Sequence, residues 1–243
     1  MSRVAIIIPA RLKSSRLPNK VILPILGKPM IERVYKSVEK SQKTDSIYVA
    51  TDSDEVVEIV NRFGGKSIKT STHDSGTDRV AEAIQNIEAD IIINVQGDEP
   101  LIDPELIDSL IELSDDTSVQ FASAMHQIDS LEDLHNPNVV KVITDINGDA
   151  IYFSRNPIPY CRDGEANYKN FFQHIGIYGY RREFLEKFSK LPSSTLENAE
   201  RLEQLRAIEN GFKVRMLKTD YRSFGVDTAE DLKRVEDILK TYH

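Results

Sequence analysis

The sequence has 243 residues, with 31 basic and 39 acidic side chains, and therefore a formal net charge of −8. A chain of this length lies between one large domain and two small ones, and it can bury a core without disulfide or metal crosslinks. The acidic balance argues against a protein that coats nucleic acid, which requires net positive charge. Small anionic ligands are not excluded, because their binding depends on where the basic side chains lie.

Cysteine content and hydropathy indicate the compartment. Cys161 is the single cysteine, so the chain cannot form an internal disulfide, which fits a reducing compartment. No apolar run approaches the roughly 18 residues of a membrane span. The short apolar run after Arg3 lacks a small-residue cleavage site, so we expect no signal peptide. The sequence therefore predicts a cytoplasmic protein that does not interact with membranes.

The first half of the chain alternates apolar strands with helices. The β-branched run at 4–8 is typical of a strand buried on both faces of a parallel sheet. Apolar runs and capping residues predict further strands at 47–50, 66–69 and 91–95, and helices from Pro29, from Asp52 or Ser53, at 77–87 and at 104–113. This order predicts a doubly wound α/β sheet.

The second half has a different rhythm. Strands at 139–144 and 150–153 flank Asn147-Gly148, which predicts a type I′ hairpin. The pattern then predicts a strand at 173–180, a long helix at 196–210, a strand at 214–217 and a helix at 228–239, capped by Asp227 or Thr228. No linker or repeat separates the halves, so we expect one domain in which the second half elaborates a nucleotide-binding half.

A basic loop follows the first strand. Residues 9–20 hold four cations, Arg11, Lys13, Arg16 and Lys20. These charges repel one another unless an anion is present, and a triphosphate would accept charge-assisted hydrogen bonds from them. The loop lacks the glycine pattern of a Walker or Rossmann loop, and a solvated basic loop is the alternative.

Two aspartates follow predicted strands. Asp98 lies beyond the strand at 91–95, next to Gly97, which lets a ligand approach closely. A carboxylate there is a natural magnesium ligand, and Asp227 is a second candidate for the same metal. The alternatives are a turn for Asp98 and a helix cap for Asp227.

Polar side chains cluster in the second half. Alternation places His174, Gly176, Tyr178 and Tyr180 on one face of their strand, where they are either solvated or bound to a ligand. Arg155 follows a strand end, and the pair Glu203-Gln204 lies in the predicted long helix, where an ordinary exposed pair is the alternative. The five histidines show no zinc spacing, and no catalytic triad is evident. Positioning of phosphates with magnesium, as in phosphoryl or nucleotidyl transfer, fits better.

Together these segments resemble a known family, the 3-deoxy-manno-octulosonate (Kdo) cytidylyltransferases, or CMP-Kdo synthetases. The resemblance spans nearly the whole chain, and the blocks of the second half make it specific. The blocks that carry it are Ile8-Pro-Ala-Arg11, Ser14-Ser-Arg-Leu-Pro18 with Lys20, Gly27-Lys-Pro-Met-Ile31, Ala50-Thr-Asp52, Ser75-Gly-Thr-Asp-Arg79, Asn94-Val-Gln-Gly-Asp-Glu-Pro100, Asn138-Val-Val-Lys-Val142, Tyr152-Phe-Ser-Arg155, His174-Ile-Gly-Ile-Tyr178, Leu202-Glu-Gln-Leu-Arg206 and Gly225-Val-Asp-Thr228.

The resemblance implies a reaction and its residues. CMP would pass from CTP to the anomeric hydroxyl of Kdo with release of pyrophosphate, for lipopolysaccharide or capsule synthesis. Lys20, Asp98 and Asp227 match catalytic positions, and the two aspartates match ligands of Mg²⁺. The positions that match CTP contacts are Ala10, Arg11, Ser14, Ser15, Lys20, Ser75, Gly76, Arg79 and Gln96. Those that match sugar contacts are Gln96, Arg155, His174, Tyr178, Glu203 and Gln204.

The resemblance also implies a fold. We expect an α/β fold with a doubly wound mixed, mainly parallel sheet, like that of nucleotide-diphospho-sugar transferases, with an inserted β-rich portion for sugar binding and dimerisation. It would form a single domain, 1–243, with 1–115 mainly nucleotide-binding and 116–243 mainly sugar-binding, in a homodimer joined through 152–180.

Several positions depart from the family pattern. Asn19 stands where the family usually has glycine, and Ala229 replaces a frequent proline. The segments at 72–74 and 221–224 also contain residues that differ from the family pattern. None of these removes a proposed metal ligand. Two alternatives remain open: a cytidylyltransferase for a related acid, such as 8-amino-Kdo or a nonulosonate, and a non-catalytic nucleotide-binding protein. A glycosyltransferase is less favoured, because the Asp-x-Asp spelling at 52–54 is interpreted as a helix cap.

Overall fold

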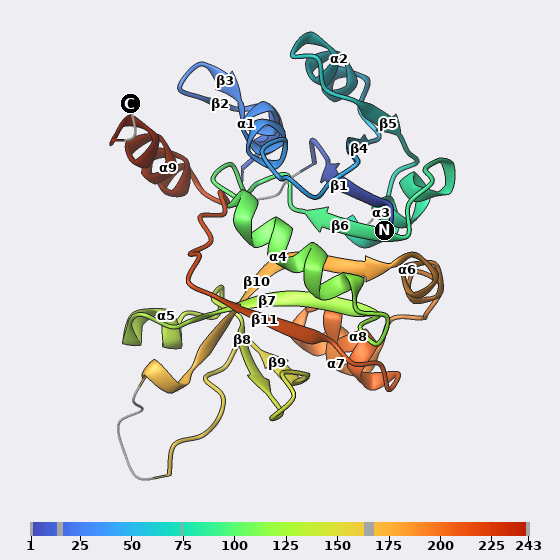
Figure 1. Ribbon diagram of the computed structural model, residues 1–243. Helices are drawn as coiled ribbons and strands as arrows, with labels where there is room; N and C mark the ends of the chain where they lie inside the picture. The colour runs from blue at the N-terminus through green and yellow to red at the C-terminus, as the bar shows by residue number, and fades with distance from the viewer. Residues whose placement is uncertain (1, 14–16, 74, 163–167, 242–243) are drawn as a thin grey trace. The chain divides into compact units, whose positions relative to one another are not determined.

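The computed structural model describes residues 2–13, 17–73, 75–162 and 168–241. The chain divides into two compact units, each described here by itself. Unit 1 comprises Met1–Ile111 and Ser223–His243, and unit 2 comprises Glu112–Arg222. Unit 1 is therefore built from two segments that are far apart in the sequence, and unit 2 is an uninterrupted insertion between them (Figure 1).

Unit 1 contains four parallel strands in the order β6-β1-β4-β5. They are β1 (Val4–Ala10), β4 (Ser46–Thr51), β5 (Ser67–Lys69) and β6 (Ile91–Val95). Ile6 of β1 lies opposite Ile47 of β4 and Ile93 of β6. The side chains of 5–8 are fully enclosed, because this central strand is covered on both faces. The four strands predicted in the first half are confirmed.

Helices connect these strands. They are α1 (Met30–Val38), α2 (Asp54–Arg62), and α3 (Gly76–Ala83) with the 3₁₀ turn η2 (Ile84–Asn86). A fourth helix, α4 (Pro104–Asp115), follows β6 and continues past Ile111 into the segment of unit 2. Ser53 caps α2 by accepting a hydrogen bond from the amide of Val56, and Ser75 caps α3 in the same way. The 3₁₀ helix η1 (Lys20–Ile22) and a short hairpin of β2 (Pro24–Ile25) and β3 (Lys28–Pro29) precede α1.

The C-terminal segment of unit 1 packs onto its N-terminal part. It carries α9 (Ala229–Thr241), and Val226 and Val235 share a buried cluster with Ile25 and Met30. At roughly 1.5–3 kcal/mol for each buried aliphatic side chain, this cluster anchors the returning chain firmly. The anchor fixes the position of Asp227, which directly follows Val226.

Unit 2 is built around β7 (Phe121–Gln127), which pairs antiparallel with β10 (Phe172–Arg181) and parallel with β11 (Arg215–Thr219). A hairpin of β8 (Lys141–Thr144) and β9 (Ala150–Ser154) joins β10 through β8. Shorter elements complete the unit: α5 (Leu131–His135), η3 (Tyr168–Asn170), α6 (Arg182–Phe188), α7 (Thr195–Glu200) and α8 (Gln204–Glu209). The predicted mixed, mainly parallel α/β class is confirmed by these pairings.

The predicted long helix at 196–210 is wrong. Two short helices, α7 and α8, replace it, because Arg201 takes a left-handed conformation with φ 56° and ends α7. Tertiary contacts fix this break. The Glu200 carboxylate accepts hydrogen bonds from the Ser154 hydroxyl at 2.6 Å and from the Arg155 amide at 2.9 Å. Glu203 and Gln204 therefore lie at the start of a new helix.

The hairpin predicted around Asn147-Gly148 is confirmed, but its turn type is not. Gly148 has φ 81°, whereas Asn147 is not among the residues with positive φ, so a type I′ turn is excluded. The amide of Gly148 donates a hydrogen bond to the carbonyl of Asp145 at 3.1 Å, and the amide of Asp145 donates one to the carbonyl of Asp149 at 2.8 Å. This is a three-residue loop with glycine at the left-handed position.

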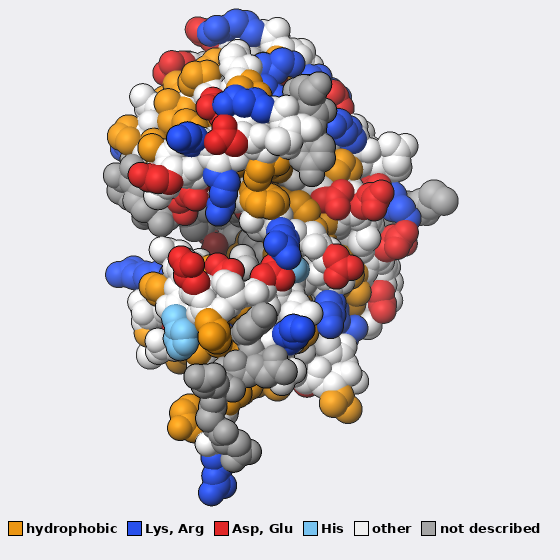
Figure 2. All heavy atoms as spheres, turned by 90° about the vertical axis from the view of Figure 1, so that its left-hand side faces the viewer, with side chains coloured by type: hydrophobic (Ala, Val, Ile, Leu, Met, Phe, Trp, Pro, Cys, Tyr) orange, Lys and Arg blue, Asp and Glu red, His pale blue; other side chains and the backbone are white. Residues whose placement is uncertain are grey.

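Two further observations bear on the expectations from composition. Within the described residues, no helix is long and apolar enough to cross a membrane. On the face drawn in Figure 2, basic and acidic side chains are interspersed. That distribution differs from the continuous basic stripe of a nucleic-acid-binding surface.

Candidate functional site

A cavity of about 780 Å³ lies in unit 1, at the carboxyl ends of β1 and β6. This is where ligands bind in open parallel sheets. Three segments contribute from outside that edge: η1, the start of α3, and Asp227 in the segment before α9. The lining residues are Pro9, Ala10, Arg11, Lys13, Lys20, Val21, Ser75, Gly76, Arg79, Gln96, Gly97, Asp98 and Asp227.

The centre of this pocket is a lysine between two aspartates. Lys20 Nζ lies 2.5 Å from Asp98 Oδ2 and 2.8 Å from Asp227 Oδ1. Burial disfavours the charged ammonium group, but the two carboxylates outweigh burial and raise the pKa of Lys20 above its usual value. Lys20 therefore stays protonated, and its charge holds the two aspartates together.

Asp227 is directed to Lys20 because a neighbouring residue caps α9. The Thr228 hydroxyl accepts a hydrogen bond from the Asp231 amide at 3.2 Å, and Asp231 accepts one from the Thr228 amide at 3.0 Å. This reciprocal arrangement satisfies the first turn of the helix. Of the two predicted caps, Thr228 performs that role, and the Asp227 carboxylate contacts Lys20 instead.

Backbone geometry shapes the floor of the pocket. A Cβ atom at Gly97 would lie 2.8 Å from the carbonyl oxygen of Pro9, so a larger residue would push the ends of β1 and β6 apart. Asn19 adopts φ 57°, a conformation that glycine takes freely and that asparagine tolerates better than most residues. Asparagine thus serves at the position where the family usually has glycine.

The predicted CTP contacts lie around this floor. Ala10, Arg11, Ser75, Gly76 and Gln96 line the cavity. Arg11 and Lys13 are exposed at its edge. Ser14 and Ser15, which were also predicted to bind CTP, lie outside the described residues, as does Arg16.

Arg79 lines the pocket but is engaged by the protein. It is almost fully buried, with its guanidinium 3.2 Å from Asp52 Oδ1 and a hydrogen bond of 2.7 Å to Thr70 Oγ1. Burial acts to raise the pKa of Asp52, but the charge of Arg79 outweighs it and lowers that pKa below the usual range. Arg79 therefore joins the ends of β4 and β5 to α3. Asp52 was not predicted as a site residue.

Glu99 is a second residue that the sequence analysis missed. Its carboxyl group accepts a hydrogen bond from the Ser223 hydroxyl, and Gly225 lies against it, with space of only 3.0 Å for a Cβ. Burial, with the nearby charge of Asp98, raises the pKa of Glu99 to about 7. The carboxyl fastens the segment before Asp227 to the end of β6. A second acidic residue after Asp98 was the available signal.

The predicted sugar-binding residues of unit 2 form a different environment. His174 is enclosed by Phe153 and Tyr178, with ring centroids 5.1 and 5.6 Å away. Burial lowers the pKa of His174 to about 3, so the ring is neutral at physiological pH. Burial and the charge of Glu203 raise the pKa of Tyr178. His174, Tyr178 and Glu203 are thus brought together.

Arg155 and Gln204 are held in different ways. The Arg155 guanidinium donates to the carbonyl oxygens of Glu200 at 2.7 Å and Pro137 at 2.9 Å. Gln204 is buried, and its side-chain nitrogen has no hydrogen-bond partner among the described residues. A buried donor without a partner costs roughly 1–3 kcal/mol, which a ligand acceptor would offset. The predicted interpretation of Glu203-Gln204 as an ordinary exposed helix pair does not hold for Gln204.

The donor set of the pocket fits magnesium. No group of three or more His, Cys, Asp or Glu side chains that could hold a metal occurs among the described residues. Mg²⁺ is usually bound through one or two carboxylates together with substrate phosphates. Asp98 and Asp227, which converge on one point, match that requirement.

Parallel strands with a polar pocket at their carboxyl ends, lined by cations and two carboxylates, define a protein that binds a phosphorylated nucleotide. Comparison with known families makes this class specific. The family model described as cytidylyltransferase matches residues 5–219. The chain belongs to the cytidylyltransferase family.

Relatives and solved structures extend this similarity over the whole chain. The 3-deoxy-manno-octulosonate cytidylyltransferase of Geobacter metallireducens is 46% identical over 251 residues, covering 99% of both chains. That of Chloroherpeton thalassium is 48% identical over 241 residues, covering 98% of both. A structure of CMP:2-keto-3-deoxy-manno-octonic acid synthetase complexed with CTP superposes with a TM-score of 0.93 at 42% identity, covering 100% of both chains.

Proposed function

We propose that this protein transfers CMP from CTP to Kdo, giving CMP-Kdo and pyrophosphate. The observation that carries the proposal is Lys20 held between Asp98 and Asp227 in a pocket lined by further cations. The relatives named for this reaction, which match nearly the full chain, support it. We extend that name to this chain because the blocks of both units are present.

The bond changes define what the residues do. The anomeric hydroxyl oxygen of Kdo forms a bond to the α-phosphorus of CTP, while the bond to the oxygen that bridges to the β-phosphate breaks. The hydroxyl proton is lost to solvent, and pyrophosphate leaves with the electron pair. The Lys20 ammonium group would offset negative charge that develops on the α-phosphate. Arg11, Lys13, Ser75, Gly76, Arg79 and Gln96 would orient the nucleotide.

Magnesium belongs to the proposal. Asp98 and Asp227 would hold Mg²⁺, which would neutralise phosphate charge and favour ionisation of the sugar hydroxyl. Lys20 binds the same two carboxylates and so adds a fixed positive charge beside them.

The sugar acid is assigned to unit 2. Arg155, whose guanidinium is fixed by two backbone carbonyls, would bind the carboxylate of Kdo through a charge-assisted hydrogen bond. His174, Tyr178, Glu203 and Gln204 would bind its hydroxyl groups. A neutral histidine suits that purpose, because it offers one donor and one acceptor.

We further propose a homodimer formed through unit 2. Among the described strands β9 forms a ladder only with β8; on its other edge the amide of Ala150 bonds to the carbonyl of Val214 at 2.8 Å, and the rest of that edge has no strand partner. Ile146 and Ile151 expose apolar side chains on this hairpin, and Ile146 is completely exposed. An open edge with apolar side chains favours association with a second copy. Sedimentation should show a dimer in the wild type and a monomer in Ile146→Asp/Ile151→Asp.

Two statements on organisation accompany the proposal. We propose that the chain works as one catalytic domain, 1–243, with 1–115 mainly nucleotide-binding and 116–243 mainly sugar-binding. We also place it in the cytoplasm, a reducing compartment that suits a chain with Cys161 as its single cysteine.

Release of pyrophosphate tests the function. The purified protein is incubated with Mg²⁺, one of CTP, UTP or ATP, and one of Kdo, 8-amino-Kdo or a nonulosonate. We expect release with CTP and Kdo. Greater kcat/KM with another acid would replace Kdo as the substrate, and no release with any pair from a folded sample would overturn the enzymatic proposal.

A further inference from the structure

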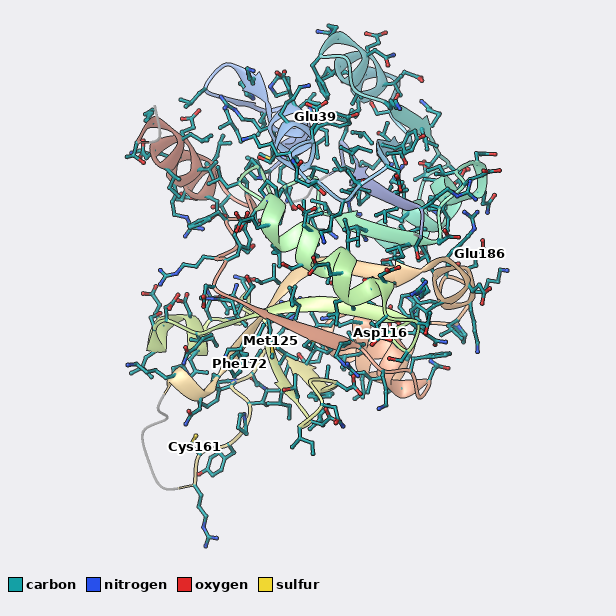
Figure 3. The ribbon with its side chains drawn as sticks, in the orientation of Figure 1. Glu39, Asp116, Met125, Cys161, Phe172 and Glu186 are labelled. Atoms are coloured by element: carbon teal, nitrogen blue, oxygen red, sulfur yellow. The ribbon has the colours of Figure 1, made fainter. Side chains whose placement is uncertain are left out.

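A buried serine of β7 contacts His174. Ser123 is fully buried, and its Oγ lies 2.9 Å from His174 Nε2. The same oxygen lies 2.9 Å from the carbonyl oxygen of Ile177 and 3.2 Å from that of Ile175. Ser123 was not predicted as a site residue. Figure 3 labels Met125, two residues further along β7, which lies opposite His174 in the strand register.

The irregular pairing of β10 explains why three groups meet at one hydroxyl. Ile175 lies opposite Ala124, but Ser123 lies opposite Tyr178, so β10 contains extra residues between these pairs. Such bulges disrupt the ladder of hydrogen bonds and redirect backbone groups, and they are frequent beside functional sites. Here the bulge brings the carbonyls of Ile175 and Ile177 to Ser123.

Counting protons assigns the direction of each hydrogen bond. A serine hydroxyl has one proton and two acceptor lone pairs, and a carbonyl oxygen can only accept. The hydroxyl proton therefore goes to a carbonyl, most favourably that of Ile177 at 2.9 Å. The contact with His174 is satisfied when Nε2 carries a proton and donates it to Ser123 Oγ. If the hydroxyl proton went to His174 Nε2 instead, both carbonyl oxygens would face lone pairs of Ser123 Oγ.

The other nitrogen of the ring then has the opposite character. A neutral imidazole with its proton on Nε2 has a lone pair on Nδ1. Within the described chain His174 Nδ1 makes no hydrogen bond, and it is not among the fully enclosed polar atoms without a partner. It is therefore an acceptor that has no partner within the described chain and is not fully enclosed.

We propose that Ser123 is a positioning residue that fixes His174 as the Nε2–H tautomer, so that Nδ1 accepts a hydrogen bond from a hydroxyl group of the sugar acid. This inference rests on the proposed function for the identity of the ligand. The tautomer itself does not depend on it. His174 then recognises a hydroxyl group of the polyol, and the carboxylate of the sugar acid is left to Arg155.

Nitrogen-15 NMR of the histidine side chains tests the tautomer in the protein without substrate. The signal of His174 is identified by its loss in His174→Gln. We expect wild-type His174 to show a protonated Nε2 and an unprotonated Nδ1, and Ser123→Ala to populate the Nδ1–H form. Ser114→Ala is the matched control, because Ser114 is equally buried and its hydroxyl has no partner among the described residues. A wild-type Nδ1–H tautomer, or an unchanged tautomer in Ser123→Ala, would overturn the proposal.

Kinetics then test the consequence for binding. Ser123→Ala should raise the KM for the sugar acid about tenfold with little change in the KM for CTP, the size expected for one misdirected hydrogen bond. Ser123→Thr keeps the hydroxyl group and should retain both the wild-type tautomer of His174 and the wild-type KM for the sugar acid. An unchanged sugar KM in Ser123→Ala would remove the role in binding. If the wild type releases no pyrophosphate with any sugar acid, the proposed function fails, while the NMR result still decides the tautomer.

Discussion

The pocket of unit 1 and the polar cluster of unit 2 around His174 differ in electrostatics: the pocket is built from charged side chains, whereas the histidine of the cluster is neutral. In the pocket, Lys20 is charged and paired with Asp98 and Asp227, and further cations line the wall. In the cluster, His174 is neutral, and aromatic rings enclose it. Charge dominates the first site, and the direction of hydrogen bonds dominates the second.

This difference matches the chemistry of the two proposed substrates. A triphosphate carries several negative charges, so fixed positive charge and metal ions give most of its recognition. A sugar acid carries one carboxylate and several neutral hydroxyl groups, so its recognition needs donors and acceptors in defined directions. The four predictions below test this contrast, from the largest expected effect to the smallest.

Removing one carboxylate of the pocket should have the largest effect. Asp227→Asn keeps the shape of the side chain but loses the charge that pairs with Lys20 and would hold Mg²⁺. We expect the rate of pyrophosphate release to fall by about a hundredfold or more, as for loss of a charged group at a reaction centre. Asp237→Asn on the exposed face of α9 is the control and should leave the rate unchanged. A near-normal rate in Asp227→Asn would contradict the metal assignment.

The neutral state of His174 should appear as a pH dependence of stability. Burial lowers the pKa of His174 in the folded protein from 6.5 to about 3. The contribution of the neutral ring to the free energy of unfolding is therefore complete above pH 6.5 and is lost as pH falls towards 3. At pH 5 the loss is about 2 kcal/mol. Denaturant unfolding at pH 8 and pH 5 should therefore show a smaller decrease for His174→Gln than for the wild type. Equal decreases would mean that His174 titrates normally.

Arg155 should affect the sugar acid and leave the nucleotide unaffected. Arg155→Ala removes the guanidinium that we assign to the carboxylate, and the KM for Kdo should rise about tenfold while the KM for CTP changes little. Arg162→Ala, on the segment after β9, serves as the control. Equal increases in both KM values would show that Arg155 acts through general stability.

The break between α7 and α8 should give the smallest effect. Arg201 has φ 56°, a conformation that costs most L-residues about 1–2 kcal/mol and glycine very little. Arg201→Gly should therefore leave stability unchanged or increase it by up to about 1 kcal/mol, measured by denaturant unfolding. The KM for the sugar acid should be unchanged, because Glu200 still fastens the end of α7. A clear loss of stability would show that the Arg201 side chain itself holds the break.

Sequence patterns predicted unit 1 well because its signals are local. Buried parallel strands are continuous apolar runs, and Ser53 and Ser75 are recognisable caps. Asp98 was identifiable as a carboxylate after such a strand. The pairing of Lys20 with Asp227 depends on a return of the chain over 207 positions, which no local pattern encodes.

Unit 2 was less predictable because tertiary contacts decide its local structure. The segment at 196–210 has a helical apolar pattern, but contacts between Glu200 and the end of β9 break it at Arg201. Strand β7 was missed, since its small and polar residues lack clear alternation. Ser123 contacts His174 and two carbonyls because of a bulge in β10, and no sequence signal predicts that contact.

The order of synthesis follows from the way unit 1 is assembled. Asp227 comes after the whole of unit 2 in the chain, whereas Lys20 and Asp98 come before it. A growing chain emerges from its N-terminus at about 5–20 residues per second, so the first two residues wait several seconds for the third. During that interval the nascent chain holds the basic loop and one aspartate without the second carboxylate. A complete nucleotide pocket thus forms only after unit 2 has left the ribosome.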